Sequence, residues 1–302
     1  MHKENPQLGN KNKAERVQVV AKTVGLVVKN DTRALAKADA LADWLKAEGC
    51  QVVRKTSNPP NCEFHDCSPS VAPENLFCVV VLGGDGTFLS AVRWLGDQQP
   101  PLLGVKFGEV GFLAEASEES LFEAMKAIVH APFTTRARMR LRAEVWCRDQ
   151  LVASEAVLND MVINRGALAR LAHIKTYVDD RYLTDYRADG LIVSTPTGST
   201  AYSLAAGGPI MHPTVQGFLV TPICPFTLTN RPIILPSEVV IQVELGERIK
   251  DVTVTCDGQV ACELASSDKI FISAAPNPLG LIKTPTIDYF EILRTKLKWG
   301  QY

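Results

Sequence analysis

The apolar and polar residues of the first 130 positions follow two patterns in turn. Short apolar runs, such as Val24–Val28, have the composition of buried strands, and stretches such as Thr32–Glu48 have the apolar spacing of an amphipathic helix. We expect strands at 24–28, 51–53, 77–82 and 102–105, and helices at 32–48, 88–95 and 118–130. Strands that alternate with helices predict a parallel sheet with helices on its faces, so residues 16–133 are expected to form an α/β domain.

From about residue 134 onward, the pattern changes to an alternation of apolar and polar residues. Alternating segments occupy 138–146, 151–158, 173–178, 239–245, 252–256 and 269–273. Few helical patterns separate them, which predicts a mostly antiparallel β domain over residues 134–284. An amphipathic helix is expected at 289–298, with residues 285–302 packing back on the first domain. The polar residues 1–15 are expected to form a disordered tail.

Charge and cysteine content argue against several classes of protein. The 302 residues carry 32 Lys and Arg against 33 Asp and Glu, so we expect no partner that is a nucleic acid or a membrane. No apolar run reaches the length of a membrane span, and the N-terminus lacks the apolar segment of a secretory signal. Eight scattered cysteines without a Cys-x-x-Cys pair fit a reduced, cytoplasmic protein. Cys62, His65 and Cys67 lie in a Pro-rich loop without a second pair of ligands, so no metal site is assigned to them.

Three glycines surround one carboxylate directly behind the expected strand 77–82. The loop comprises Gly83, Gly84, Gly86 and Thr87, with Thr87 expected to cap the following helix. Bare backbone N–H groups at a helix N-terminus are suited to bind phosphate. Asp85 would repel a phosphate unless it holds a metal ion or accepts a proton from an attacking hydroxyl. The loop has neither the Gly-Lys-Ser/Thr of a Walker A motif nor the spaced glycines of a dinucleotide fingerprint, so it favours phosphoryl transfer.

Three further segments carry polar groups suited to a nucleotide. Asn159 and Asp160 offer an amide for a base edge and a carboxylate for ribose hydroxyls, although such a pair is also common in turns that enter strands. A hydroxyl-rich loop follows Asp189, and in it Tyr202 presents a face for a flat ring. The turn 256–259 has the Asp-Gly pair of an ordinary hairpin and is the weakest of the three signals.

Together these segments resemble the NAD kinase family over residues 22–300. The matching segments, in chain order, are Gly83–Thr87, Asn159–Asp160, Asp189–Tyr202, Arg231–Pro236, Asp257–Gly258 and Leu293–Gly300. The glycine loop alone is shared with diacylglycerol and sphingosine kinases and, more loosely, with phosphofructokinases. The Thr-Pro-Thr-Gly-Ser-Thr-Ala-Tyr segment that ends at Tyr202 is much more specific to NAD kinases.

The resemblance implies an enzyme that transfers the γ-phosphate of ATP, or in some members of polyphosphate, to the 2′-hydroxyl of the adenosine ribose of NAD, giving NADP. A divalent metal, normally Mg²⁺, is implied as cofactor, and a homodimer or homotetramer as the assembly. Asp85 matches the proton acceptor of the family. Contacts to the dinucleotide are implied for Asp85, Gly86, Asn159, Asp160, Asp189, Thr200, Ala201, Tyr202, Ser203, Leu204 and Ala205, and by spacing for Arg170, Arg187 and Gln259.

Two positions depart from the family pattern. Lys106 stands where the family commonly has Asn, and Phe226 stands where it often has His. A phenyl ring cannot donate a hydrogen bond to a phosphate or a ribose, so a contact at Phe226 must be lost or replaced. A lipid kinase that shares the glycine loop and a non-catalytic NAD(H)-binding sensor are the alternatives. The hydroxyl-rich loop disfavours the first, and the intact Asp85 disfavours the second.

Overall fold

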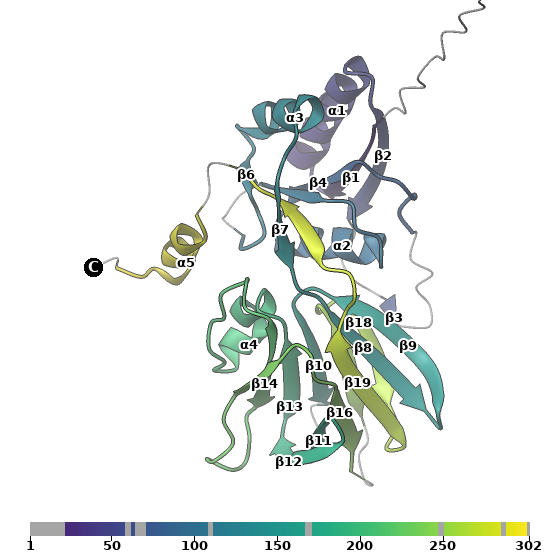
Figure 1. The fold of residues 1–302 in the computed structure, drawn as a ribbon, viewed down its shortest axis with the longest axis vertical. Helices are drawn as coiled ribbons and strands as arrows, with labels where there is room; N and C mark the ends of the chain where they lie inside the picture. The colour runs from purple at the N-terminus through teal and green to yellow at the C-terminus, as the bar shows by residue number, and fades with distance from the viewer. Residues whose placement is uncertain are drawn as a thin grey trace, which may run out of the picture.

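The computed structural model describes residues 22–57, 62–63, 71–107, 111–166, 171–246, 251–284 and 288–300. These residues form two domains, one above the other in Figure 1. The expected tail 1–15, the candidate residue Arg170, and His65 and Cys67 lie outside the described residues. Within the described part of the chain, no helix combines the length and the apolar character needed to cross a lipid bilayer.

The first domain is a parallel sheet with helices on both faces. Its elements in chain order are β1 (Thr23–Lys29), α1 (Thr32–Ala47), β2 (Gln51–Ser57), β4 (Cys78–Gly83), α2 (Asp85–Leu95), β5 (Leu102–Lys106), β6 (Ala116–Ser117) and α3 (Leu121–His130). The strand order begins β2-β1-β4-β5, and these neighbours all pair in parallel. The α/β prediction for the first half of the chain is therefore confirmed.

Strand β4 is an unbroken apolar run because its side chains are buried on both faces of the sheet. Cys78, Val80 and Leu82 belong to the cluster formed with α1 and α3, whereas Val79 and Val81 belong to the cluster formed with α2. Because both faces of the strand are buried, a polar side chain at any of these positions would lose its contact with water. Helix α2 lies on the face of the sheet that is turned towards the second domain (Figure 1).

Helix α2 begins three residues earlier than the sequence predicts. Its N-terminal cap is Gly84, so Asp85 belongs to the first helical turn. Thr87 does not cap the helix, because it lies inside the first turn with its side chain buried against Gly83. The prediction fails because apolar periodicity begins only at Phe88, whereas the backbone already turns helical ahead of it.

Two strands that the sequence assigns to the second domain complete the sheet of the first. β7 (Thr135–Arg138) and β20 (Leu279–Ile282) pair with each other antiparallel, and β20 pairs with β5 in parallel. The chain thus leaves the first domain through β7 and returns to it through β20. Strands so far apart in the sequence leave no local signal of their pairing. The expected limits at 133 and 284 therefore place β7 and β20 in the wrong domain.

The sequence predicts that the C-terminal helix packs back on the first domain. The helix, α5 (Tyr289–Leu297), places the rings of Tyr289 and Phe290 at 5.0 and 5.8 Å from the ring of His212 in the second domain. Burial raises the pKa of Tyr289, and the charge of Arg138 on β7 lowers it. Helix α5 therefore lies near β7 but touches the second domain, and the return to the first sheet is made by β20.

The second domain consists of two sheets with mostly antiparallel strands, as the alternating segments predict. One sheet has the order β15-β14-β13-β10-β17-β18-β3, and the other has the order β12-β11-β16-β19-β8-β9. The strands of the first are β10 (Asp160–Arg165), β13 (Gly190–Ser194), β14 (Gly217–Ile223), β15 (Ile233–Pro236), β17 (Val252–Cys256), β18 (Val260–Leu264) and β3 (Cys62–Glu63). Those of the second are β8 (Leu141–Cys147), β9 (Gln150–Val157), β11 (Ala172–Val178), β12 (Arg181–Ala188), β16 (Ile241–Leu245) and β19 (Asp268–Ala274). The pair β18 and β3 is parallel.

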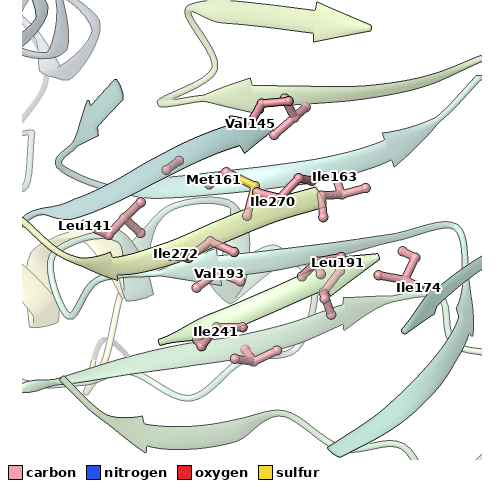
Figure 2. Close-up of a cluster of buried hydrophobic side chains, with 14 of the residues drawn as sticks. Leu141, Val145, Met161, Ile163, Ile174, Leu191, Val193, Ile241, Ile270 and Ile272 are labelled. Atoms are coloured by element: carbon pink, nitrogen blue, oxygen red, sulfur yellow. The ribbon is translucent and has the colours of Figure 1, made fainter. Parts of the chain in front are cut away.

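Figure 2 shows the apolar core that the two sheets share. Side chains of one sheet (Met161, Ile163, Leu191, Val193) and of the other (Leu141, Val145, Ile174, Ile241, Ile270, Ile272) are all buried in one cluster. Burial of one such side chain contributes about 1.5–3 kcal/mol. The core fixes the strands, and the loops that follow β9 and β13 carry the residues that the sequence singles out. The second of these loops contains a 3₁₀ turn, η1 (Gly198–Thr200), and the short helix α4 (Tyr202–Ala205).

Candidate functional site

The glycine loop ends at the N-terminus of α2. A side chain added at Gly84 or Gly86 would meet no other atom within 4 Å, so the backbone is open to a ligand at both positions. The N-terminus of an α-helix carries partial positive charge and unpaired N–H groups, which favour an anion such as a phosphate. The geometry is that of an anion-binding loop with one carboxylate, Asp85, in its first helical turn.

The backbone of a distant segment holds the carboxylate of Asp85. The N–H of Phe112 donates to Oδ2 at 3.1 Å, and the N–H of Leu113 donates to Oδ1 at 3.3 Å. Gly111 makes this approach possible, because a side chain there would overlap the carboxylate. Sequence reasoning misses these three residues. The signal that points to them is a glycine that no predicted turn requires.

Asp160 begins β10 with a side chain that is almost fully buried. Burial and the neighbouring charge of Asp257 raise its pKa to about 7, although the backbone N–H of Tyr202 acts in the opposite direction. Burial also raises the pKa of Asp257 to about 6, against the effect of three backbone N–H groups that favour its charged form. A buried carboxyl that titrates near neutrality is typical of a functional site.

The hydroxyl-rich loop packs directly on Asn159. The N–H of Thr195 donates to the Asn159 carbonyl at 2.9 Å, and the Thr195 hydroxyl donates to the Leu158 carbonyl at 2.5 Å. A side chain on Gly198 would overlap the same Asn159 carbonyl. The structure therefore brings the Asn-Asp pair and this loop into one cluster.

The side chains of Thr200–Ala205 differ in what they can reach. Tyr202 is 43 % exposed, so its ring is accessible to a ligand. Ser203 is buried, and its hydroxyl pairs with that of Thr221 at 2.9 Å, so its side chain supports the loop from within. The remaining members of the segment are partly or fully exposed: Thr200, Ala201, Leu204 and Ala205.

Asp189 and Arg187 lie at the other end of β13. Five residues of extended strand, a length of about 16 Å, separate Asp189 from the loop that begins at Thr195. Two guanidinium nitrogens of Arg165 bind Asp189 Oδ1, at 2.8 and 2.7 Å. The guanidinium of Arg187 lies 5.2 Å from the ring centre of Phe226, which is a cation–π contact. Within one subunit, the structure does not bring these residues to the cluster around Asn159.

The sequence resemblance implies NAD as the substrate, and on that expectation Asp189→Ala should raise the KM for NAD more than it lowers kcat. A side chain that binds ground state and transition state equally affects KM alone, and the full length of β13 between Asp189 and the loop at Thr195 favours such a role for Asp189. Steady-state kinetics with varied NAD measures both constants. The control is Asp185→Ala, which removes from β12 an acid that is paired with His173 and should leave both constants unchanged. A fall in kcat at constant KM would instead assign Asp189 to the chemical step.

Two lysines flank the glycine loop. The register of β4 and β5 sets Lys106 beside Gly83, and Lys29 ends β1 on the other side of β4. Lys29 is paired with Asp31 at 3.1 Å, whereas no ion pair within the described residues involves Lys106. Alternation along β5 puts Lys106 on the same face as Leu102, which is the face that α2 covers. Lys106 therefore supplies a positive charge next to the anion-binding loop.

An α/β domain with an anion-binding loop, joined to a β domain that carries Asn159 and the buried Asp160, fits a phosphotransferase that acts on small molecules. Residues 24–133 match the ATP-NAD kinase N-terminal domain, and residues 158–284 match the ATP-NAD kinase C-terminal domain. The chain is 50% identical over 279 residues to the NAD kinase of Desulfatibacillum aliphaticivorans, covering 92% of this chain and 98% of the relative. It is 57% identical over 229 residues to the NAD kinase of Syntrophobacter fumaroxidans, and the match covers 76% of this chain and 81% of the relative. The chain belongs to the NAD kinase family.

Two solved structures share the fold. The yeast NADH kinase complexed with NADH has a TM-score of 0.81 at 24% identity and covers 94% of this chain and 89% of its own. The NAD kinase from Archaeoglobus fulgidus in complex with ATP has a TM-score of 0.71 at 25% identity, and the match covers 91% of this chain and 98% of that structure's chain. The predicted two-domain architecture, the resemblance and the assignment as an enzyme are confirmed.

Proposed function

We propose that this chain transfers the terminal phosphate of ATP to the 2′-hydroxyl of the adenosine ribose of NAD, with Asp85 as general base. The observation that carries the proposal is the position of Asp85, held by two backbone N–H groups beside the open backbone of Gly84 and Gly86. Asp85 accepts the proton of the hydroxyl while the ribose oxygen bonds to phosphorus and ADP leaves. A well-placed general base typically contributes about 10²–10⁴-fold to the rate.

The β domain supplies the groups that would hold the adenosine half of NAD. Asn159 offers an amide to the base, Asp160 accepts a hydrogen bond from the ribose, and Tyr202 offers an exposed ring for stacking. Leu158 is buried in the same cluster as Phe88 of α2. This contact between domains supports a ribose position between the Asn-Asp pair and the start of α2.

The donor phosphates would bind at the glycine loop. Its backbone N–H groups, the N-terminus of α2 and the charge of Lys106 all act on the same anion. Phosphoryl transfer needs this neutralisation because the transferring group carries charge on three oxygens. A polyphosphate chain presents the same chemistry, so it is the alternative donor.

We propose Mg²⁺ as a companion of the donor phosphates. Among the residues that the structure describes, no three His, Cys, Asp or Glu side chains form a complete metal site. Mg²⁺ often binds mainly through substrate phosphates and waters, so the donor phosphates would hold the ion and leave Asp85 as the base. Such an ion supplies charge stabilisation to the transferring phosphate.

The product is expected to be NADP alone, without the 3′-phosphate isomer, because a ribose held on one side presents one hydroxyl to Asp85. The assay incubates the protein with NAD, ATP and Mg²⁺ and detects NADP with an NADP-specific dehydrogenase. Phosphorus NMR against authentic NADP then identifies the phosphorylated hydroxyl. A substantial 3′-phosphate signal would overturn the assignment. So would phosphorylation of diacylglycerol with NAD untouched.

We further propose that the chain acts in the cytoplasm as a homodimer or homotetramer. Leu228 is 86% exposed and Phe226 is 65% exposed, and apolar surface of this kind next to β14 is suited to contact a second copy. The buried thiols of Cys50, Cys78 and Cys256 are free, which fits a reducing compartment. Light scattering of the purified protein measures the size of the assembly.

A further inference from the structure

The hairpin turn Asp257–Gln259, between β17 and β18, touches both domains at once. Asp257 and Gly258 have φ angles of 52° and 60°, the left-handed pair that an Asp-Gly hairpin adopts readily. Turn geometry therefore accounts for Gly258. It does not account for the side chains of Asp257 and Gln259, which both bind backbone atoms of other segments.

The carboxylate of Asp257 holds the segment that contains the Asn-Asp pair. Its Oδ2 accepts the N–H of Leu158 at 3.0 Å, and its Oδ1 accepts the N–H groups of Asn159 and Asp160 at 2.7 and 3.2 Å. Three donors converge on one half-buried carboxylate, so the backbone of this segment has a single well-defined arrangement. By fixing this backbone, Asp257 orients the side chains of Asn159 and Asp160.

The side chain of Gln259 reaches the other half of the site. Its Nε2 donates to the carbonyl oxygen of Gly86 at 3.0 Å, and its own backbone carbonyl accepts from Arg93 of α2 at 3.3 Å. Gly86 is the residue next to Asp85 in the first turn of α2. The contact therefore acts on the backbone that carries the proposed general base.

The far end of α2 is also attached to the second domain. The buried guanidinium of Arg140 donates to the carbonyl of Gly96, at the end of α2, at 2.6 Å and to the carbonyl of Asn277 at 2.9 Å. Arg140 thus holds the C-terminal end of α2 in place, and Gln259 holds its first turn in place. With one end held by Arg140, small changes at Gln259 translate into a tilt of the first turn of α2.

We propose that the turn Asp257–Gln259 is a positioning element that sets the place of Asp85 relative to the Asn-Asp pair. Asp257 holds the NAD-binding segment, Gln259 holds the start of α2, and two peptide bonds join their Cα atoms through Gly258. The inference rests on the proposed function. It assigns Gln259 a role through Asp85, in place of the direct contact with the dinucleotide that the sequence resemblance implies.

The test compares Gln259→Glu and Gln259→Ala with the wild-type chain. Glu keeps the size of the side chain but turns an acceptor towards the Gly86 carbonyl, and Ala removes the side chain altogether. Both variants should lower kcat about tenfold, because small displacements of a catalytic group are costly in rate, while the KM for NAD stays within about twofold. The matched control is Gln242→Ala, which removes a glutamine that donates to Glu244 at 2.9 Å on β16 and should change neither constant.

A double variant separates positioning from a general loss of structure. In an Asp85→Asn background, adding Gln259→Glu should lower the remaining rate by less than about twofold, because both changes act on the same group. A full tenfold loss in that background would overturn the inference. A rise in the KM for NAD at constant kcat would also overturn it, since Gln259 would then contact the dinucleotide. If the wild-type chain itself makes no NADP, the proposed function fails and the inference fails with it.

Asp257→Asn tests the other half of the turn. One amide oxygen cannot accept three N–H groups, so the Asn-Asp pair should lose its orientation and the KM for NAD should rise about tenfold, with a smaller fall in kcat. The control is Asp268→Asn, which changes a buried Asp that also accepts a backbone N–H, from Ala265 at 2.8 Å. Equal effects of both variants on KM would assign Asp257 to general stability and overturn its positioning role.

Discussion

Replacing Asp85 by Asn is expected to lower the kcat of NADP formation by about two orders of magnitude or more, while NAD binding survives with a modest loss. The amide keeps the size of the side chain but cannot take the proton of the ribose hydroxyl. One of its two atoms can still accept from the N–H of Phe112 or Leu113, so the local fold should persist. Steady-state kinetics measures kcat, and calorimetric titration measures NAD binding.

A matched control for this change lies in the neighbouring helix. Asp31 caps α1 by accepting the N–H of Ala34 at 2.9 Å, so Asp31→Asn makes the same replacement at a helix start in the same domain. The control should cost a fraction of a kcal/mol in stability and nothing in kcat. If Asp85→Asn retains a tenth or more of the wild-type kcat, Asp85 is not the proton acceptor.

The second large effect concerns the free energy of unfolding as a function of pH. The pKa of Asp160 rises from 3.8 to about 7 in the folded chain, through burial and then through the charge of Asp257. The folded chain therefore binds a proton that the unfolded chain has released, between about pH 4 and pH 7. Wherever the folded state holds the extra proton, stability falls as pH rises. Ionising Asp160 thus costs the folded protein progressively more up to neutral pH.

Asp160→Asn should remove this cost. Relative to the wild-type chain, the variant should become more stable between pH 5 and pH 8, by up to roughly 4 kcal/mol for a shift of about three pKa units. Urea unfolding at several pH values measures the difference, and the value at about pH 3, below both pKa values of Asp160, corrects for changes in packing. A difference that stays constant from pH 5 to pH 8 would contradict the shifted pKa.

Much of the fold follows from periodicity along the chain. The run 24–28 becomes β1, the amphipathic stretch 32–48 becomes α1, and the alternating segments become strands of two packed sheets, because burial on one face or two leaves a local pattern. The exceptions are pairings between distant segments. β20 pairs with β5 and β7, and nothing in its four residues marks these partners.

The candidate site was predictable to the extent that its chemistry sits in short segments. The glycine loop, the Asn-Asp pair and Tyr202 stand out because glycines, paired polar groups and hydroxyls cluster along the sequence. The backbone groups that hold Asp85 belong to Phe112 and Leu113, whose apolar side chains give no sign of this contact, and the neighbouring Gly111 is the one signal in the segment. The Asp-Gly turn at 257 is a weak signal because many hairpins have that pair, yet its carboxylate accepts the N–H groups of Leu158, Asn159 and Asp160.

The path of the chain through β7 and β20 also determines the order in which a growing polypeptide completes its domains. Arg138 of β7 and its partner Leu279 of β20 are 279 − 138 = 141 positions apart, and every strand from β8 to β19 is synthesised between them. Domains usually fold during translation in the order of synthesis. Here the later domain has all its strands once Ala274 has left the ribosome, whereas β7 of the earlier domain still lacks its partner. A nascent chain that stops short of Leu279 would therefore carry a complete β domain beside an α/β sheet that is still open.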